Sequence, residues 1–113
     1  MLPVSVVIPA YNASRYIWQA VDSVLAQTRG AAEIIVVDDG SSDDLPSGLG
    51  GHLSAVTLLK QVNAGPAAAR NRGVEAATQP WLAFLDADDY WSPTKLAEQF
   101  AVVESRLSVA MVA

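Results

Sequence analysis

The sequence lacks cysteine, long apolar runs and a high content of charge. Without cysteine, the chain can form neither disulfide bonds nor thiolate metal sites. No apolar run approaches the ~18 residues of a membrane-spanning helix. Residues 1–3 show neither the basic region nor the cleavage site of a signal peptide. Charged residues make up only 17% of the chain and hydrophobic residues 51%, so we expect a folded protein with no membrane segment.

Basic residues are few. Seven Lys and Arg face twelve Asp and Glu, and the net charge is −5. This balance disfavours a nucleic-acid partner and a basic membrane patch, although Arg70 and Arg72 leave one local positive spot. A length of 113 residues suffices for one compact domain with a single core.

Short apolar runs alternate with segments of helical periodicity. The apolar runs predict buried strands at residues 4–8, 34–37, 55–59 and 81–85, with Trp81 and Phe84 in the core. Helices are predicted after a Ser14 N-cap, over residues 66–77 and from Ser92 onward, and a further strand is expected at 108–113. Strands that are joined by helices pair in parallel with right-handed crossovers. The expected fold is α/β, an open and mostly parallel sheet with helices on both faces, truncated at its C-terminal end.

Polar residues follow each predicted strand. They are Tyr11 and Asn12, then Asp38 and Asp39, then Asn63 and Gly65, and finally Asp86, Asp88 and Asp89. The carboxyl ends of parallel strands share one rim, and ligands bind there in open sheets. Polar residues with only structural roles would be scattered over both ends of the sheet. The asymmetry therefore predicts a binding site at this rim.

The strongest local signal is the apolar run 81–85 followed by three carboxylates in four positions. Carboxylates at this spacing repel one another unless a cation lies between them. Mg²⁺ or Mn²⁺ that bridges phosphates suits Asp86 and Asp88, because hard cations take oxygen ligands. The alternative is that Asp88 and Asp89 cap the helix that follows.

Three further residues are candidates for contacts to a nucleotide. The helix that begins at Pro66 offers free N–H groups to a phosphate, and Arg70 lies one turn in; alternatively, Arg70 is a solvated helix residue. Asp39 is a candidate for accepting a donor from a base or ribose, or it is a turn residue. Tyr11 is a candidate for stacking on a base, or it packs at the strand end.

Four segments resemble the inverting family 2 glycosyltransferases in order and spacing, and together they cover essentially the whole chain. They are residues 4–12 (VSVVIPAYN), 36–43 (VVDDGSSD), 63–71 (NAGPAAARN) and 84–89 (FLDADD). The resemblance implies a Rossmann-like nucleotide-diphospho-sugar transferase fold that binds a nucleotide-sugar donor, with UDP favoured, and Mg²⁺ or Mn²⁺. It implies that Asp88 is the main metal ligand and that Asp86 faces the donor sugar or ribose. The residues it implies in substrate binding are Pro9, Ala10, Tyr11, Asn12, Asp39, Asn63, Gly65, Arg70, Asp86, Ala87 and Asp88.

One departure from the family pattern matters. Family members continue into an acceptor-binding half that supplies the catalytic base, whereas this chain stops at Ala113. The resemblance therefore implies that residues 1–113 are the nucleotide-sugar-binding part, with no catalytic base among them and a saccharide or lipid-linked acceptor bound elsewhere. We expect a cytoplasmic location, or the cytoplasmic face of a membrane for the full-length enzyme, and a homodimer through the truncated edge.

Two other functions remain open at this point. A metal-dependent nucleotidyltransferase also uses carboxylates at a parallel-sheet rim, but it usually shows a Gly-rich basic loop after its first strand, unlike residues 9–12. A non-enzymatic receiver-like signalling domain would need a lysine at a late strand end. Lys60, at the end of the third predicted strand, is the only strand-end lysine.

Overall fold

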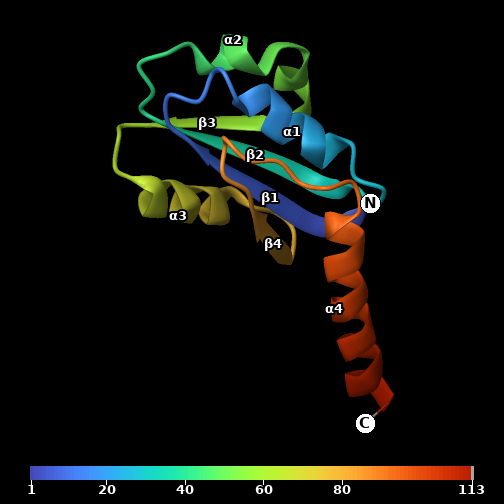
Figure 1. The fold of residues 1–113 in the computed structure, drawn as a ribbon. Helices are drawn as coiled ribbons and strands as arrows, with labels where there is room; N and C mark the ends of the chain where they lie inside the picture. Colours follow the sequence, from blue (N-terminus) through green and yellow to red (C-terminus); the bar gives the residue numbers. More distant parts are fainter. Residues whose placement is uncertain (113) are drawn as a thin grey trace.

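The computed structural model describes residues 1–112 and has one parallel sheet with helices on both faces (Figure 1). All strand pairs are parallel, and the strand order is β3-β2-β1-β4. The predicted fold class is thereby confirmed. In chain order the elements are β1 (Leu2–Ala10), α1 (Ile17–Leu25), β2 (Ala31–Asp39), α2 (Leu45–Leu49), the 3₁₀ helix η1 (Gly50–Ala55), β3 (Thr57–Gln61), α3 (Pro66–Ala76), β4 (Trp81–Phe84) and α4 (Lys95–Val112).

The core has two layers because side chains alternate along the central strands. Val6, Ile8 and Val36 face α1 and α2 on one side of the sheet, whereas Ile35 and Val37 face α3 on the other. Figure 1 shows α1 and α2 above the sheet and α3 below it. Both central strands are thus covered on both faces, as their continuous apolar sequences predict.

Strand β4 departs from the expected burial. Among the described residues it pairs only with β1, and its side chains Trp81 and Phe84 are 40% and 46% exposed. The prediction that these two aromatics belong to the core is wrong, because β4 is an edge strand within residues 1–112. An apolar edge strand of this kind is a surface that proteins usually cover.

The C-terminal segment also differs from the prediction. Residues 108–112 continue α4 and do not start a strand, and Ala113 lies outside the described residues. Leu96, Phe100 and Val103 recur at helical spacing, and the same period continues through Leu107. We expected a homodimer to form through a strand edge in this segment. Residues 108–112 offer no such edge, because they are helical. No helix within residues 1–112 has the length and apolar character needed to cross a membrane.

Two other local predictions are wrong. Helix α1 begins at Ile17, and Ser14 lies in the turn before it, where its main-chain N–H donates to Asp43 Oδ2 at 3.0 Å. Strand β3 begins two residues later than predicted, because η1 extends to Ala55. The strand consequently delivers Gln61 to the rim, next to Asp39.

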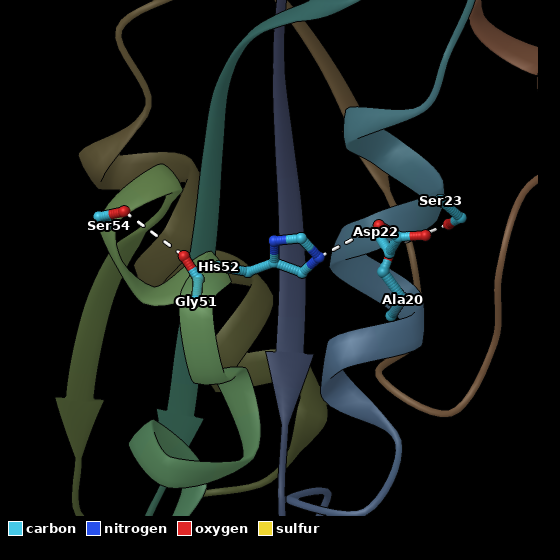
Figure 2. A network of polar contacts seen from close by, with 6 residues as sticks. All are labelled: Ala20, Asp22, Ser23, Gly51, His52 and Ser54. Atoms are coloured by element: carbon cyan, nitrogen blue, oxygen red, sulfur yellow. Dashed lines mark hydrogen bonds and ion pairs between the residues drawn. The ribbon is translucent and has the colours of Figure 1, made fainter.

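A polar contact fastens η1 to α1 (Figure 2). His52 Nε2 lies 3.1 Å from Asp22 Oδ1, and the imidazole stacks on Trp18 with 4.6 Å between ring centroids. Figure 2 shows the His52 ring pointing from η1 toward Asp22 on α1. The contact holds the connection between β2 and β3 against the helix that follows β1.

Glu33 organises the end of the sheet opposite to the rim. Its Oε1 accepts hydrogen bonds from Ser5 Oγ at 2.7 Å and from the Thr78 main-chain N–H at 2.9 Å. Burial alone would raise the pKa of Glu33, but these hydrogen bonds from Ser5 and Thr78 together lower it below the ordinary value. Ionised Glu33 therefore ties β1 and β2 to the chain that leads into β4.

We expect Glu33→Gln to lower the free energy of unfolding at neutral pH by about 1 kcal/mol, since a charged acceptor is lost. A carboxyl whose pKa is lower in the folded chain stabilises the fold above its unfolded pKa, and this stabilisation disappears as the pH falls through the folded pKa. The difference from wild type should therefore shrink toward acid pH. Urea unfolding at several pH values measures it, with the exposed Glu75→Gln as control. A pH-independent difference would contradict the role of the charge.

Candidate functional site

A cavity of about 570 Å³ lies at the carboxyl rim of the sheet, between the loops that follow the strands. Its walls come from residues 9–13 at the end of β1 and in the loop after it, from Asp39 at the end of β2, and from Asn63, Gly65 and Pro66 at the start of α3. The loop after β4 closes the remaining side with residues 86–88. Residues far apart in the sequence thus meet because parallel strands deliver them to one edge.

The loops after β1 and β2 are joined by reciprocal hydrogen bonds. Asn12 Oδ1 accepts from the Ser42 main-chain N–H at 2.8 Å, and the Asn12 main-chain N–H donates to Ser41 Oγ at 3.0 Å. Asn12 has φ of +49°, a left-handed conformation that asparagine tolerates better than most residues. Its side chain therefore fixes the loop, in which the neighbouring Tyr11 is 55% exposed and lines the cavity.

Asp39 is only 3% exposed, and its carboxylate accepts several hydrogen bonds from its own chain. The Gln61 side chain and the Ala64 main-chain N–H donate to Oδ1, each at 2.8 Å. The Gly65 main-chain N–H donates to Oδ2 at 3.0 Å. The hydrogen bond from Gln61 lowers the pKa of Asp39, burial opposes it, and the bonds from Ala64 and Gly65 lower it further. Asp39 is therefore an ionised acceptor that also shapes the turn before α3.

The N-terminus of α3 opens onto the cavity. Gly65 has φ of +100° at the N-cap, and Pro66 occupies the first helical position, where its missing N–H costs nothing. The helix can approach the sheet closely because Gly73 packs against Val7, where a larger residue would clash. Ala69 is fully buried at the sheet and lines the cavity floor. A helix N-terminus in this place attracts an anion.

Two carboxylates from the loop after β4 border the same cavity. Asp86 and Asp88 line it, and Arg70 Nη2 lies 3.8 Å from Asp86 Oδ1. Asp88 and Asp89 do not cap the following helix, because α4 begins only at Lys95. Asp89 instead accepts a hydrogen bond at 2.8 Å from the main-chain N–H of its neighbour Tyr90.

The donor set at this edge suits a divalent metal that a ligand helps to hold. Within residues 1–112, no three His, Cys, Asp or Glu side chains converge as a metal site. Asp86 and Asp88 can therefore supply only part of a coordination shell. Mg²⁺ and Mn²⁺ commonly take one or two carboxylates and complete their shells with water and phosphate oxygens. The residues present fit such a metal if a phosphate ligand is bound beside it.

The structure brings together ten of the eleven substrate-binding residues predicted from sequence. Arg70 alone does not line the cavity, although its guanidinium approaches Asp86. Four lining residues were missed: Ala13, Tyr16, Pro66 and Ala69. The small-residue composition of α3 could have indicated Ala69, whereas Tyr16 depends on the turn before α1. An open parallel α/β sheet with a polar cavity at its rim defines a ligand-binding domain of the Rossmann-like class.

Comparison with known proteins identifies the family. The sequence model of Glycosyl transferase family 2 matches residues 5–113. An uncharacterized glycosyltransferase of Nostoc sp. is 44% identical over 99 residues, which are 84% of this chain and 31% of that relative. The chain therefore belongs to glycosyl transferase family 2, and it spans less than a third of that relative's length.

Solved structures share the fold. A crystal structure of S. aureus TarS in complex with UDP-GlcNAc has a TM-score of 0.80 and 27% identity, covering 92% of this chain and 32% of that chain. A mannosyltransferase of Pyrobaculum calidifontis in complex with GDP-Man and Mn²⁺ has a TM-score of 0.76 and 28% identity, covering 84% of this chain and 30% of that chain.

Proposed function

We propose that this chain binds the nucleotide-sugar donor of an inverting glycosyltransferase, a UDP-sugar, together with Mg²⁺ or Mn²⁺. The observation that carries the proposal is the shared cavity at the rim. It combines an aromatic loop, a helix N-terminus and a pair of carboxylates within about 570 Å³. A nucleoside diphosphate needs these three surfaces, one each for its base, its phosphates and its metal.

Different groups of cavity residues would bind the different parts of such a ligand. Residues 9–12 and Asp39 hold the nucleoside, and Asn63 and Gly65 with the N-terminus of α3 face the diphosphate. Arg70 adds positive charge near the phosphates. Asp88 is the main metal ligand, and Asp86 faces the sugar or ribose. The proposal is supported by the UDP-GlcNAc and the GDP-Man with Mn²⁺ in the two structural neighbours.

The proposal extends to the chemistry of the whole enzyme. When bound, the metal neutralises the charge that develops on the departing diphosphate. An acceptor hydroxyl attacks the anomeric carbon in one step after a base has removed its proton. We assign no carboxylate of this chain as that base, and the acceptor is a saccharide or a lipid-linked saccharide.

Calorimetry with the 113-residue chain tests the proposal. We expect UDP and a UDP-sugar to bind in the presence of Mn²⁺, and AMP to bind at least tenfold more weakly, since the site is built around specific donors and acceptors. Absence of UDP binding with either Mn²⁺ or Mg²⁺ would contradict the proposal.

The same measurement separates the other two functions. A nucleotidyltransferase would favour nucleoside triphosphates over UDP-sugars. A receiver-like domain would bind Mg²⁺ and a phosphoryl analogue without any nucleotide. The position of Lys60 disfavours a receiver, because this residue lines a different cavity with Asp38 and does not face Asp86 or Asp88 across the larger cavity.

A further inference from the structure

The Asp39 carboxylate has four hydrogen-bond donors from its own chain. Oδ1 accepts from Gln61 Nε2 and from the Ala64 N–H, each at 2.8 Å. Oδ2 accepts from the Gly65 N–H at 3.0 Å and from Asn63 Nδ2 at 3.3 Å. A carboxylate offers about four lone-pair positions, so its capacity is used in full.

The two oxygens have different surroundings. Asn63 and Gly65, which bind Oδ2, line the 570 Å³ cavity together with Asp39 itself. Gln61 lines a different cavity of about 430 Å³, which Asp39 does not line, and Ala64 lines neither cavity. Oδ1 is therefore held from outside the site, whereas Oδ2 lies on the side of the site.

One of the two bonds to Oδ2 is exchangeable. Asn63 Nδ2 lies 3.0 Å from the main-chain carbonyl oxygen of Asp39, closer than its 3.3 Å to Oδ2. Asn63 can thus keep its bond to the carbonyl while a ligand donor replaces the longer bond. The bonds from Gln61 and Ala64 would keep the carboxylate in place during this exchange.

We propose that Gln61 is a positioning residue for nucleobase selection, whose amide fixes Asp39 Oδ1 so that Oδ2 accepts a ring N–H from the base. This inference rests on the proposed function. It predicts selection for bases with a ring N–H donor at the Watson–Crick edge, such as uracil, over cytosine, whose corresponding nitrogen is an acceptor. We expect Gln61 to make no contact with the ligand, because it does not line the cavity that Asp39 lines.

The pKa of Asp39 agrees with this role. The hydrogen bond from Gln61 is the largest cause that lowers it, ahead of the opposing effect of burial. An ionised carboxylate can only accept hydrogen bonds, so it discriminates between a donor and an acceptor on the base. A site of this kind rejects a partner that leaves its buried polar group unpaired.

Gln61→Met tests the proposal, because methionine keeps the length of the side chain and removes its N–H donor. We expect the Kd for UDP to rise about fivefold, the usual effect of one lost hydrogen bond. The ratio of UDP affinity to CDP affinity should fall by a similar factor, since cytosine makes no use of Oδ2. Gln19→Met, on an exposed position of α1, is the matched control and should change neither value. All titrations contain Mn²⁺.

Side-chain amide NMR signals of the wild-type chain give a second test that needs no variant to fold. On addition of UDP with Mg²⁺, the Asn63 side-chain amide signal should shift strongly, because its bond to Oδ2 is replaced. The Gln61 side-chain amide signal should stay close to its position in the free chain. A shift of Gln61 with an unmoved Asn63 would overturn the assignment.

The outcomes separate the inference from the proposed function. If wild type binds UDP and Gln61→Met has the same affinity and the same preference over CDP, the inference fails and the proposed function stands. If Gln61→Met weakens UDP and CDP equally, Gln61 has only a structural role and the inference fails as well. If wild type binds no nucleotide with either metal, both fail.

Discussion

UDP should bind to the wild-type chain at least tenfold more tightly with Mn²⁺ than in chelator, and Asp88→Ala should remove most of that difference. Asp86 and Asp88 are the two cavity carboxylates that follow β4, and within residues 1–112 no third His, Cys, Asp or Glu side chain converges with them as a metal site. Removal of one therefore halves the protein's share of the metal shell. We expect a loss of about tenfold or more in UDP affinity, roughly 1.4 kcal/mol.

Asp89→Ala is the matched control for this experiment. It removes the same charge one residue away, but Asp89 does not line the cavity and its carboxylate instead bonds to the Tyr90 N–H. Its UDP affinity with Mn²⁺ should stay within about twofold of wild type, since a neighbouring exposed charge acts weakly through solvent. Equal UDP binding with metal and in chelator would disprove the metal assignment. Equal losses of UDP affinity in Asp88→Ala and Asp89→Ala would mean that the loss reflects the removal of negative charge in general and not of a metal ligand.

The rim was predictable from sequence because parallel pairing places the ends of all strands together. Apolar β-branched runs such as 34–37 indicate strands that are buried on both faces, and those runs fix where Asp39 and Asp86 emerge. The convergence of these residues at one rim can therefore be predicted without knowing any side-chain contact. This is why ten of them line one cavity.

The surroundings of the rim were less predictable. The burial of Trp81 depends on whether β4 is paired with a strand on each side. The apolar sequence of β4 does not indicate whether it is a central or an edge strand. The role of Gln61 depends on the register of β3 against β2, which pairs it with Asp39. The strand predicted at residues 55–59 begins and ends two residues before β3, so Gln61 lay outside the predicted strand. Register errors of this size move functional side chains even where the fold is right.

Gly48 shows how close packing behind the cavity constrains one residue of α2. Glycine inside a helix is ordinarily less stable than alanine by about 0.5–1 kcal/mol, so propensity alone favours Gly48→Ala. A Cβ at this position would clash with the carbonyl oxygen of Ser14 and lie 2.7 Å from its Cα. The obstacle is main chain and cannot rotate away, and overpacking of this kind costs about 1–3 kcal/mol.

The clash should therefore outweigh the gain in propensity, and Gly48→Ala should lower the free energy of unfolding by about 1–2 kcal/mol. Because Ser14 belongs to the loop that joins Asn12 to α1, UDP affinity should fall as well. Gly51→Ala in η1 is the matched control, since its Cβ would meet no atom within 4 Å and stability should not decrease. Thermal unfolding and UDP titration of both variants measure these effects. A Gly48→Ala chain as stable as Gly51→Ala would mean that the loop after β1 can yield, and that the cavity wall is softer than its hydrogen bonds to residues 41–43 indicate.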